Sequence, residues 1–533
     1  MTMKASTAQP RFRLAAATAV AALLAPCAAT AGPIALTSPD GIISLSGEFV
    51  AVEDGHFVVE TGLGQLRVAS DRVACEGSAC PMLDPADADV RLIGSQAIAL
   101  GLMPLLLDGY AAHLDAAVTL NDTGIDGRIT GDLVAAGGFG DAIGRFLVEP
   151  TNSLDAFAAL GDGRADLAMS SRRILPDEAR ALRNGGAGEM ANPGQEHILA
   201  IDSLAVITHP ENPVRDITMT ELADVFAGRI TNWSALGGPD APIAIIDRDA
   251  ESGTRATFYR AIFGATVPQT GTDGRAIADN GDETARMVMK DPNAIGFVGM
   301  PFQRDTKALR IVNACGMVTE PDAFAAKLEE YPLQRRLYLY NRGEELAPEA
   351  RDFLDYATSE HADDVIAKSG FIDLGIMRKS QDLNGPRARM LLDPEVDAFE
   401  GGVMREMLAE MVAYDRLSTT FRFRTGSSRL DERGAIDMPR LINYLEGMPE
   451  GTRVLFVGFT DDVGGFANNR RLSIARAQKV AADIGALAGD RLSGIRIAAT
   501  GFGEIAPSTC NTTEVGRAVN RRVEVWIDVD RQG

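Results

Sequence analysis

Apolar and polar residues alternate in the N-terminal part of the chain, and the pattern then changes to apolar runs separated by helical repeats. The alternation at residues 42–52 and 56–60 predicts a small β module over residues 32–87. From Val90 onward, short apolar runs precede segments in which apolar residues recur every three or four positions, a pattern typical of strands followed by helices. The middle of the chain is therefore predicted to be an α/β domain.

Two apolar runs predict that this domain has two lobes. Residues 198–208 form a nearly continuous apolar run, which we interpret as a strand that crosses into a second lobe. Residues 294–298 form another, which we expect to lead back to the first lobe. Two strands that pass between the lobes form a hinge. In α/β sheets of this kind, ligands bind where the carboxyl ends of the strands face a cleft.

The segment 242–264 predicts a strand, a polar turn and a helix that ends at Gly264, and the turn has the features of an anion site. Ser252 is suited to cap the helix, and Gly253 lets the backbone approach a ligand closely. The N–H groups that follow, near Thr254, carry the positive end of the helix dipole. Arg248 adds a charged, bidentate donor. The alternative interpretation is an ordinary capped helix.

Four sequence strings in this domain share their order with a known family. The string Arg-x-x-x-Ser-Gly-Thr-Arg-x-x-Phe at 248–258, together with 222–238, 163–172 and 331–340, resembles the phosphate-binding proteins of ABC transporters. The resemblance covers residues 90–376. It implies the two-lobed periplasmic-binding-protein fold, phosphate or a similar oxyanion as ligand, and an ABC permease as a candidate partner.

The same resemblance implies further phosphate ligands on two other turns. The first turn follows the strand from Val90 and the second follows the strand at 166–169, and together they contribute Ser95, Gln96, Ala97, Ser170, Ser171 and Arg172. The alternatives are that Ser95 only begins a helix and that Arg172 is a surface charge. The turn at 151–153 lacks the family's glycines, and no aspartate accompanies Ser171, so discrimination among oxyanions is expected to be weak.

A β, α, β, α, β pattern predicts a separate α+β domain from residue 417 onward. Its segments 454–464, 469–480, 501–507 and 516–524 resemble the OmpA-like peptidoglycan-binding domain. The resemblance implies that Asp461 binds the ammonium of a diaminopimelate side chain and that Arg476 binds its carboxylate, with Thr460 and Asn469 completing the pocket. Without the surrounding segments, these residues would be interpreted as ordinary surface groups.

Charge and the N-terminal sequence favour an exported protein that does not bind nucleic acid. The formal net charge of −22 makes nucleic acid and a bare anionic membrane poor partners. Residues 1–31 have a basic start, an apolar run at 14–25 and an A-x-A sequence ending at Ala31, which predicts a secretory signal peptide. A membrane anchor, or lipid attachment at Cys27, is the alternative. No later apolar run is long enough for a transmembrane span.

The cysteines favour a disulfide over a metal site. Cys75 and Cys80 are five residues apart and are predicted to form a disulfide in an oxidising compartment, the alternative being a metal pair. The five histidines have no ligand spacing with one another or with cysteine, so we predict no metal and no cofactor. Because no paired carboxylates or nucleophile elbow occur, we expect no catalytic residues and no enzyme activity.

These observations predict the following order of segments: signal peptide 1–31, β module 32–87, two-lobed domain 88–376, linker with one helix 377–416, and OmpA-like domain 417–533. The predicted function is a periplasmic oxyanion-binding protein, associated non-covalently with peptidoglycan and the outer membrane. The competing hypothesis is a structural or adhesive wall protein whose binding domain has lost its ligand.

Overall fold

The computed structural model describes residues 33–38, 43–53, 56–62, 64–69, 73–77, 79–80, 88–125, 127–137, 141–250, 252–264, 274–382, 398–423, 430 and 432–528. The signal peptide predicted at 1–31 lies outside these residues. The chain divides into two compact units, Met1–Pro81 and Met82–Gly533, which are described separately.

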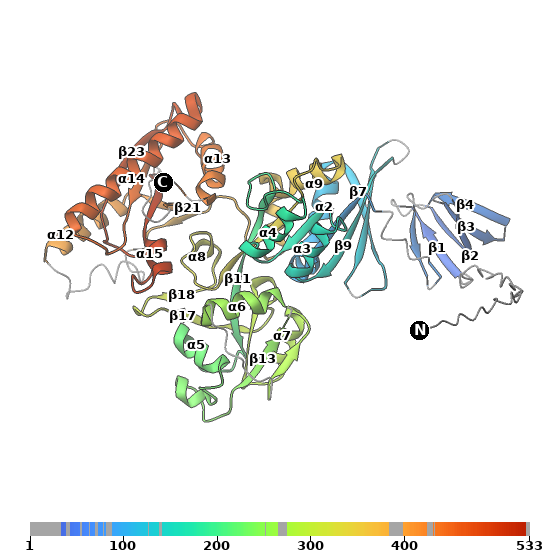
Figure 1. Ribbon diagram of the computed structural model, residues 1–533, viewed down its shortest axis with the longest axis horizontal. Coiled ribbons are helices and arrows are strands. Elements are labelled where there is room, and N and C mark those ends of the chain that lie inside the picture. Colours follow the sequence, from blue (N-terminus) through green and yellow to red (C-terminus); the bar gives the residue numbers. More distant parts are fainter. Residues whose placement is uncertain are drawn as a thin grey trace, which may run out of the picture. The chain divides into compact units, whose positions relative to one another are not determined.

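The first unit is a five-stranded antiparallel sheet in the order β4-β3-β2-β1-β5, as the sequence predicted. Its strands are β1 Pro33–Thr37, β2 Ser44–Glu53, β3 His56–Thr61, β4 Gly64–Ala69 and β5 Ala74–Glu76 (Figure 1). Ile34, Phe49 and Phe57 are part of its small core. Cys75 and Cys80 form a disulfide with a Cα–Cα distance of 5.9 Å, so β5 is tied to the segment that follows it.

The second unit contains the two-lobed α/β domain, and its first lobe is a sheet covered by helices. The strands of lobe 1 are β6 Val90–Ser95, β7 Ala116–Asp122, β8 Ile129–Ala135, β9 Ala142–Thr151 and β10 Leu167–Ser170. Its helices are α1 Gln96–Gly101, α2 Met103–His113, α3 Ser153–Gly161, α4 Pro176–Asn184, α9 Pro348–Thr358, η5 Glu360–Ala362 and α10 Asp363–Lys368. One hydrophobic cluster joins α2 and α9 to the buried faces of β6 and β9.

Lobe 2 is built from the chain between residues 209 and 333. Its strands are β12 Asp216–Thr218, β13 Ala244–Arg248, β14 Ala276–Ala278, β15 Ala294–Gly299, β16 Lys307–Ala308, β17 Arg310–Val312 and β18 Val318–Thr319. Its helices are α5 Met219–Phe226, η3 Trp233–Leu236, α6 Gly253–Phe263, α7 Gly281–Val288, η4 Met300–Phe302 and α8 Ala323–Lys327. Aromatic side chains of α5, α6 and β15, including Phe226, Phe258 and Phe297, pack together in its core.

Two antiparallel strands connect the lobes: β11 Glu196–Thr208 leads into lobe 2 and β19 Gln334–Tyr340 leads out of it. The predicted crossing at 198–208 is confirmed, but the return strand is β19. Residues 294–298, which we expected to lead back, belong to β15 and pair with the lobe 2 end of β11. An apolar run shows that a strand is buried, and it does not show to which lobe the strand belongs.

The C-terminal domain is a sheet in the order β20-β21-β24-β22-β23 with helices packed against it. Its elements are β20 Arg378–Ser380, α12 Ala398–Met411, β21 Asp415–Arg422, α13 Glu432–Glu446, β22 Arg453–Gly458, α14 Phe466–Ala488, η6 Gly489–Leu492, β23 Arg496–Gly501, α15 Glu514–Asn520 and β24 Arg522–Asp528. Met407 and Met411 of α12 pack with Trp526. The segment predicted as a linker therefore contributes a strand and a packed helix to this domain.

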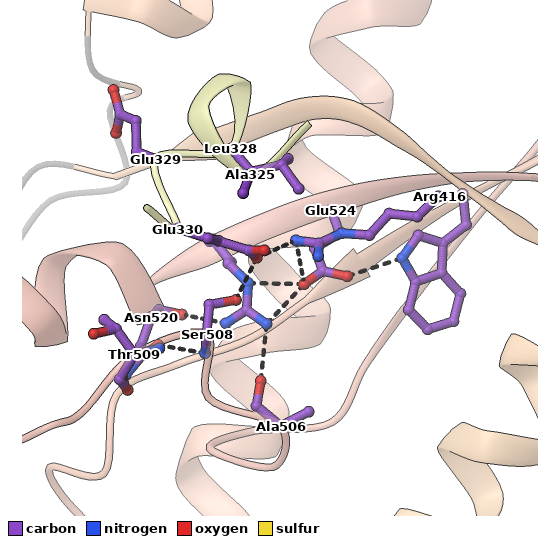
Figure 2. Close-up of polar contacts among 12 residues, drawn as sticks. Ala325, Leu328, Glu329, Glu330, Arg416, Ala506, Ser508, Thr509, Asn520 and Glu524 are labelled. Carbon is purple, nitrogen blue, oxygen red and sulfur yellow. Dashed lines mark hydrogen bonds and ion pairs between the residues drawn. The ribbon is translucent and has the colours of Figure 1, made fainter. Parts of the chain in front are cut away.

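Lobe 2 and the C-terminal domain are joined by a disulfide and by a buried ion-pair network. Cys315, in the turn after β17, is bonded to Cys510, 195 residues later. Figure 2 shows Arg416 between Glu330 and Glu524, with nitrogen–oxygen distances of 2.7 and 2.9 Å. Burial lowers the pKa of Arg416, but the attraction of the two carboxylates outweighs it and leaves the pKa above its ordinary value.

Candidate functional site

A cleft of 680 Å³ lies where the turns that begin α1, α3 and α6 meet. Its walls come from both lobes and include Ser95, Gln96, Ala97, Thr151, Asn152, Ser153, Arg248, Ser252, Gly253 and Thr254. Each turn follows the carboxyl end of a strand, namely β6, β9 and β13. The sequence-predicted residues of the first and third turns are therefore brought together in one cavity.

The turn before α6 has the geometry predicted from its sequence. The Ser252 hydroxyl accepts a hydrogen bond of 3.3 Å from the N–H of Arg255, which makes Ser252 the N-cap. The helix runs from Gly253 to Phe263 and is capped by Gly264, whose φ of 71° suits glycine. The N–H groups of Gly253 and Thr254 precede the first turn's internal bonds, so they remain available to an anion.

A buried carboxylate that the sequence reasoning missed holds this turn in place. Asp247, at the end of β13, is 1% exposed and accepts hydrogen bonds from the Tyr259 hydroxyl at 2.5 Å, Arg275 Nη1 at 3.1 Å and Arg255 Nε at 3.2 Å. Arg255 also lies over the Tyr259 ring, 4.0 Å from its centroid. Burial, reinforced by the bond to Asp247, raises the pKa of the Tyr259 hydroxyl. Tyr259 therefore stays a neutral donor, and α6 is fixed to β13.

Arg248 lies in the cleft wall and is held there by neutral acceptors. Its Nε donates to the carbonyl of Ala278 at 3.1 Å, and its Nη2 donates to the carbonyl of Asp279 at 2.9 Å and to the side-chain oxygen of Gln96 at 3.4 Å. The nearest carboxylate oxygen is that of Asp249, 3.8 Å away. Burial lowers the pKa of the guanidinium. Its side-chain hydrogen bonds to described residues are made by Nε and Nη2. The charge of Arg248 is thus positioned but only weakly neutralised.

The turn between β6 and α1 requires a glycine. Gly94 has φ of 144°, and a Cβ at this position would lie 2.1 Å from the carbonyl oxygen of Met169 on the neighbouring strand. The next residue, Ser95, caps α1 without a side-chain hydrogen bond to the helix, so its hydroxyl remains available to a ligand. Helix α1 starts directly after Ser95 at Gln96, and a second helix follows at Met103.

Three small residues bring the lobes into close contact beside the cleft. Ser153 Oγ lies 3.4 Å from Ser171 Oγ and accepts a hydrogen bond of 3.1 Å from the N–H of Ser171. A Cβ on Gly253 would lie 2.5 Å from Ser171 Oγ and 3.3 Å from Ser153 Oγ. Gly253 of lobe 2 therefore lies directly against two serines of lobe 1. Ser153 and Asn152, from the turn without the family's glycines, line the cleft together with Thr151.

The lining of the cleft includes none of the predicted ligands Ser170, Ser171 and Arg172. The Ser170 hydroxyl donates to the carbonyl of Arg172 at 2.7 Å and stabilises the turn after β10. Arg172 forms a bidentate pair with Glu178 of α4, with distances of 2.6 and 2.8 Å, and lies over the Phe157 ring. The carboxylate of Glu178, six residues later, holds Arg172 away from the cleft. This ion pair neutralises the charge of Arg172 without a ligand.

Carboxylates also line the cleft, which sequence reasoning missed. Asp249, Asp279 and Asp282 belong to its wall, as does Arg304. The Arg304 guanidinium is paired with Asp282, with a nitrogen–oxygen distance of 2.6 Å. Asp249 and Asp279 directly follow β13 and β14, and Asp282 lies in the first turn of α7. Acidic residues are common in turns and at helix starts, so the sequence alone did not indicate a cleft position for them.

The C-terminal domain brings its four predicted residues together with a fifth. Asp461 and Arg476 are both buried, but the carboxylate of Asp461 accepts a bond of 2.7 Å from Arg521, which sequence reasoning had not assigned. Asn469 Nδ2 donates to the carbonyl of Asp461 at 3.4 Å. The Thr460 hydroxyl is buried and makes no hydrogen bond with any residue that the structure describes.

The Arg476 guanidinium is left ready for an anion. Its Nη1 is buried and has no hydrogen-bond partner among the described residues. Its Cζ lies 5.1 Å from the centroid of the Phe423 ring. Burial lowers the pKa of Arg476, the charge of Asp461 raises it, and Arg521 lowers it further. The three groups therefore lie within electrostatic range of one another, and a carboxylate beside Arg476 would satisfy the buried donor.

Residues 84–361 match the PBP superfamily domain, over more than half of the chain. The chain belongs to the PBP superfamily. The phosphate-binding protein PstS of Bacillus subtilis is 31% identical over 195 residues, which are 36% of this chain and 62% of that protein. An ABC-type phosphate transport receptor from Vibrio cholerae is similar in structure, at 23% identity and a TM-score of 0.40, over 53% of this chain and 99% of that one.

Residues 422–521 match the OmpA family. Outer membrane porin F of Pseudomonas fluorescens is 40% identical over 96 residues, which are 18% of this chain and 28% of that protein. The fusion of the two domains predicted from the sequence is confirmed. In the part of the chain that the structure describes, no helix has the length and apolar character to cross a membrane, and no three acidic, histidine or cysteine residues are grouped to hold a metal ion.

Proposed function

We propose that this protein is a receptor for phosphate or a similar oxyanion in the periplasm, attached non-covalently to peptidoglycan. The observation that carries the proposal is the convergence of three helix-starting turns and Arg248 on one cleft. Similarity to phosphate-binding proteins supports phosphate as the ligand.

The polar groups of the cleft suit a small tetrahedral anion. Backbone N–H groups at Gly253 and Thr254 and the hydroxyls of Ser95 and Ser252 offer neutral donors, and Arg248 offers a charged one. Neutral donors that are fixed before binding cost little reorganisation when the ligand arrives. Backbone N–H dipoles and the Arg248 guanidinium attract an anion at short range, and the carboxylates that also line the cleft oppose it.

The proposed wall attachment relies on the C-terminal site. A diaminopimelate side chain ends in an ammonium and a carboxylate, and the site presents the carboxylate of Asp461 beside Arg476. We propose that the ligand's carboxylate binds Arg476 and that its ammonium binds Asp461, with Arg521 remaining as the second partner of Asp461. Thr460 and Asn469 complete the pocket. An ABC permease is a proposed partner of the receptor domain.

Calorimetric titration of the full chain with phosphate, arsenate and sulfate tests the receptor function. Arg248→Ala should weaken phosphate binding by about 2 to 3 kcal/mol, the value of a hydrogen bond to a charged group. Arg286→Ala, an exposed arginine on a lobe 2 helix, is the matched control and should bind as wild type does. Absence of binding to all three anions would favour the structural wall protein instead.

A further inference from the structure

A second, smaller cavity of 180 Å³ lies on the other side of the Ser171 contact and is lined by arginines. Arg172 and Arg173 come from the turn after β10 in lobe 1, Arg260 comes from α6 in lobe 2, and Arg335 and Arg336 come from the connecting strand β19. Five guanidinium groups around one cavity are unexpected in a chain whose net charge is −22. Basic side chains from both lobes and from their connection therefore meet at this cavity.

This cavity is distinct from the phosphate cleft. The first turn of α6, with Gly253 and Thr254, lines the cleft, whereas Thr257 and Arg260 of the following turns line the second cavity. Ser171 lies in the wall of the second cavity and against Gly253. The contact between Ser171 and Gly253 thus separates the two spaces.

Four of the five arginines already have carboxylate partners. Arg172 is paired with Glu178 at 2.6 Å, Arg173 with Glu196 at 2.9 Å and Arg335 with Asp202 at 2.8 Å. Arg336 is paired with Glu329. Arg260 is exposed and makes no ion pair among the residues that the structure describes. One positive charge at the cavity therefore remains without compensation.

Arg335 supplies a second observation that indicates a ligand. Its side chain is 3% exposed, and Nε and Nη2 contact Asp202. Its Nη1 is buried and has no hydrogen-bond partner within the part of the chain that the structure describes. Buried donors in native proteins are almost always satisfied, so an unpartnered guanidinium nitrogen on a residue that lines a cavity indicates a missing acceptor. An anion in the cavity would provide that acceptor and the counter-charge for Arg260.

We propose that this cavity is a second anion site, which takes a small inorganic oxyanion such as phosphate or sulfate. Its donors come from lobe 1, lobe 2 and the strand that connects them. An anion bound there attracts guanidinium groups of both lobes, above all the uncompensated Arg260 of lobe 2. Its binding therefore favours the arrangement in which Gly253 lies against Ser171, and it tightens binding in the cleft. By linkage, a ligand in the cleft tightens the second site equally.

Equilibrium dialysis of the full chain against inorganic phosphate tests this site separately from the proposed phosphate cleft. Wild type should bind two equivalents, and Arg260→Ala should bind one, with its remaining affinity reduced about fivefold or more by lost coupling. Because Arg260 is exposed, its replacement should leave the fold intact by circular dichroism. Arg286→Ala, which removes an exposed arginine from another lobe 2 helix, should keep both equivalents.

Arg248→Ala separates failure of the second site from failure of the cleft. If Arg248→Ala loses one equivalent and Arg260→Ala loses the other, both sites are supported. If wild type binds a single equivalent, or if Arg260→Ala keeps two, the second site is refuted and the cleft is not. If Arg260→Ala loses an equivalent while Arg248→Ala loses none, the second site stands and the cleft assignment fails. Dialysis against sulfate shows whether the second site takes either oxyanion.

Discussion

Replacing Gly253 with alanine should weaken oxyanion binding without weakening the fold. The added Cβ would lie 2.5 Å from Ser171 Oγ and 3.3 Å from Ser153 Oγ, whereas unstrained contacts between heavy atoms are about 3.5 Å or longer. One of the two lobes, or the Ser171 hydroxyl, must therefore move by about 1 Å. A movement of either lobe would shift the Gly253 N–H away from its position in the cleft.

The expected loss follows from the hydrogen bonds that this movement disturbs. Losing one hydrogen bond to a charged ligand costs about 1.5 to 3 kcal/mol of binding free energy. This loss raises the dissociation constant roughly tenfold to hundredfold. The stability of the unliganded protein should stay the same or rise slightly. Gly253 begins α6, and alanine exceeds glycine in helix propensity by up to about 1 kcal/mol.

Calorimetric titration with phosphate measures the affinity, and thermal unfolding without phosphate measures the stability. Gly485→Ala is the matched control, because Gly485 lies in helix α14 and no neighbouring atom lies within 4 Å of the added Cβ. This control should raise stability slightly and leave phosphate binding unchanged. Wild-type affinity in Gly253→Ala would refute the close contact between the lobes at this position.

Three further predictions concern the proposed peptidoglycan site at Asp461 and Arg476, the buried ion pair of Glu330 and the disulfide of the first unit. Asp461→Ala or Arg476→Ala should weaken the free energy of binding to peptidoglycan by about 2 to 5 kcal/mol, because either change leaves an opposite charge unpaired. Less of the full chain should then co-sediment with peptidoglycan, and unchanged sedimentation would contradict the assignment. Glu330→Ala should destabilise the chain by about 1 to 3 kcal/mol in thermal unfolding, since it removes one acceptor of a buried arginine; an unchanged midpoint would argue against the network. Mass spectrometry of unreduced exported protein should find Cys75 linked to Cys80, with modest loss of stability on reduction; free thiols at both would exclude it.

Features that depend on neighbouring residues could be predicted from the sequence. The turn that contains Ser252 and Gly253 follows from a strand, a capping residue and a helical repeat that occur within about twenty residues. Gly264 ends that helix as the sequence indicated. The crossing strand β11 was predictable because a long apolar run requires burial on both faces.

Features that depend on distant partners could not be predicted. The return of the chain through β19 and the bond between Cys315 and Cys510 join residues whose proximity only the folded topology creates. Arg172 shows the opposite limit: it lies in the predicted string, but a carboxylate on the next helix binds it. Arg521 likewise became recognisable as part of the wall site only when its contact with Asp461 was visible.

The most direct test of the receptor assignment is calorimetric titration of phosphate into the full chain after bound ligand has been removed by unfolding and refolding. We expect phosphate to bind with measurable heat and to raise the unfolding temperature, because binding to the folded state alone stabilises it. In Arg248→Ala, binding in the cleft should be weaker by about 2 to 3 kcal/mol while the fold is retained. Equal phosphate binding by wild type and Arg248→Ala, or no binding by refolded wild type, would contradict the account.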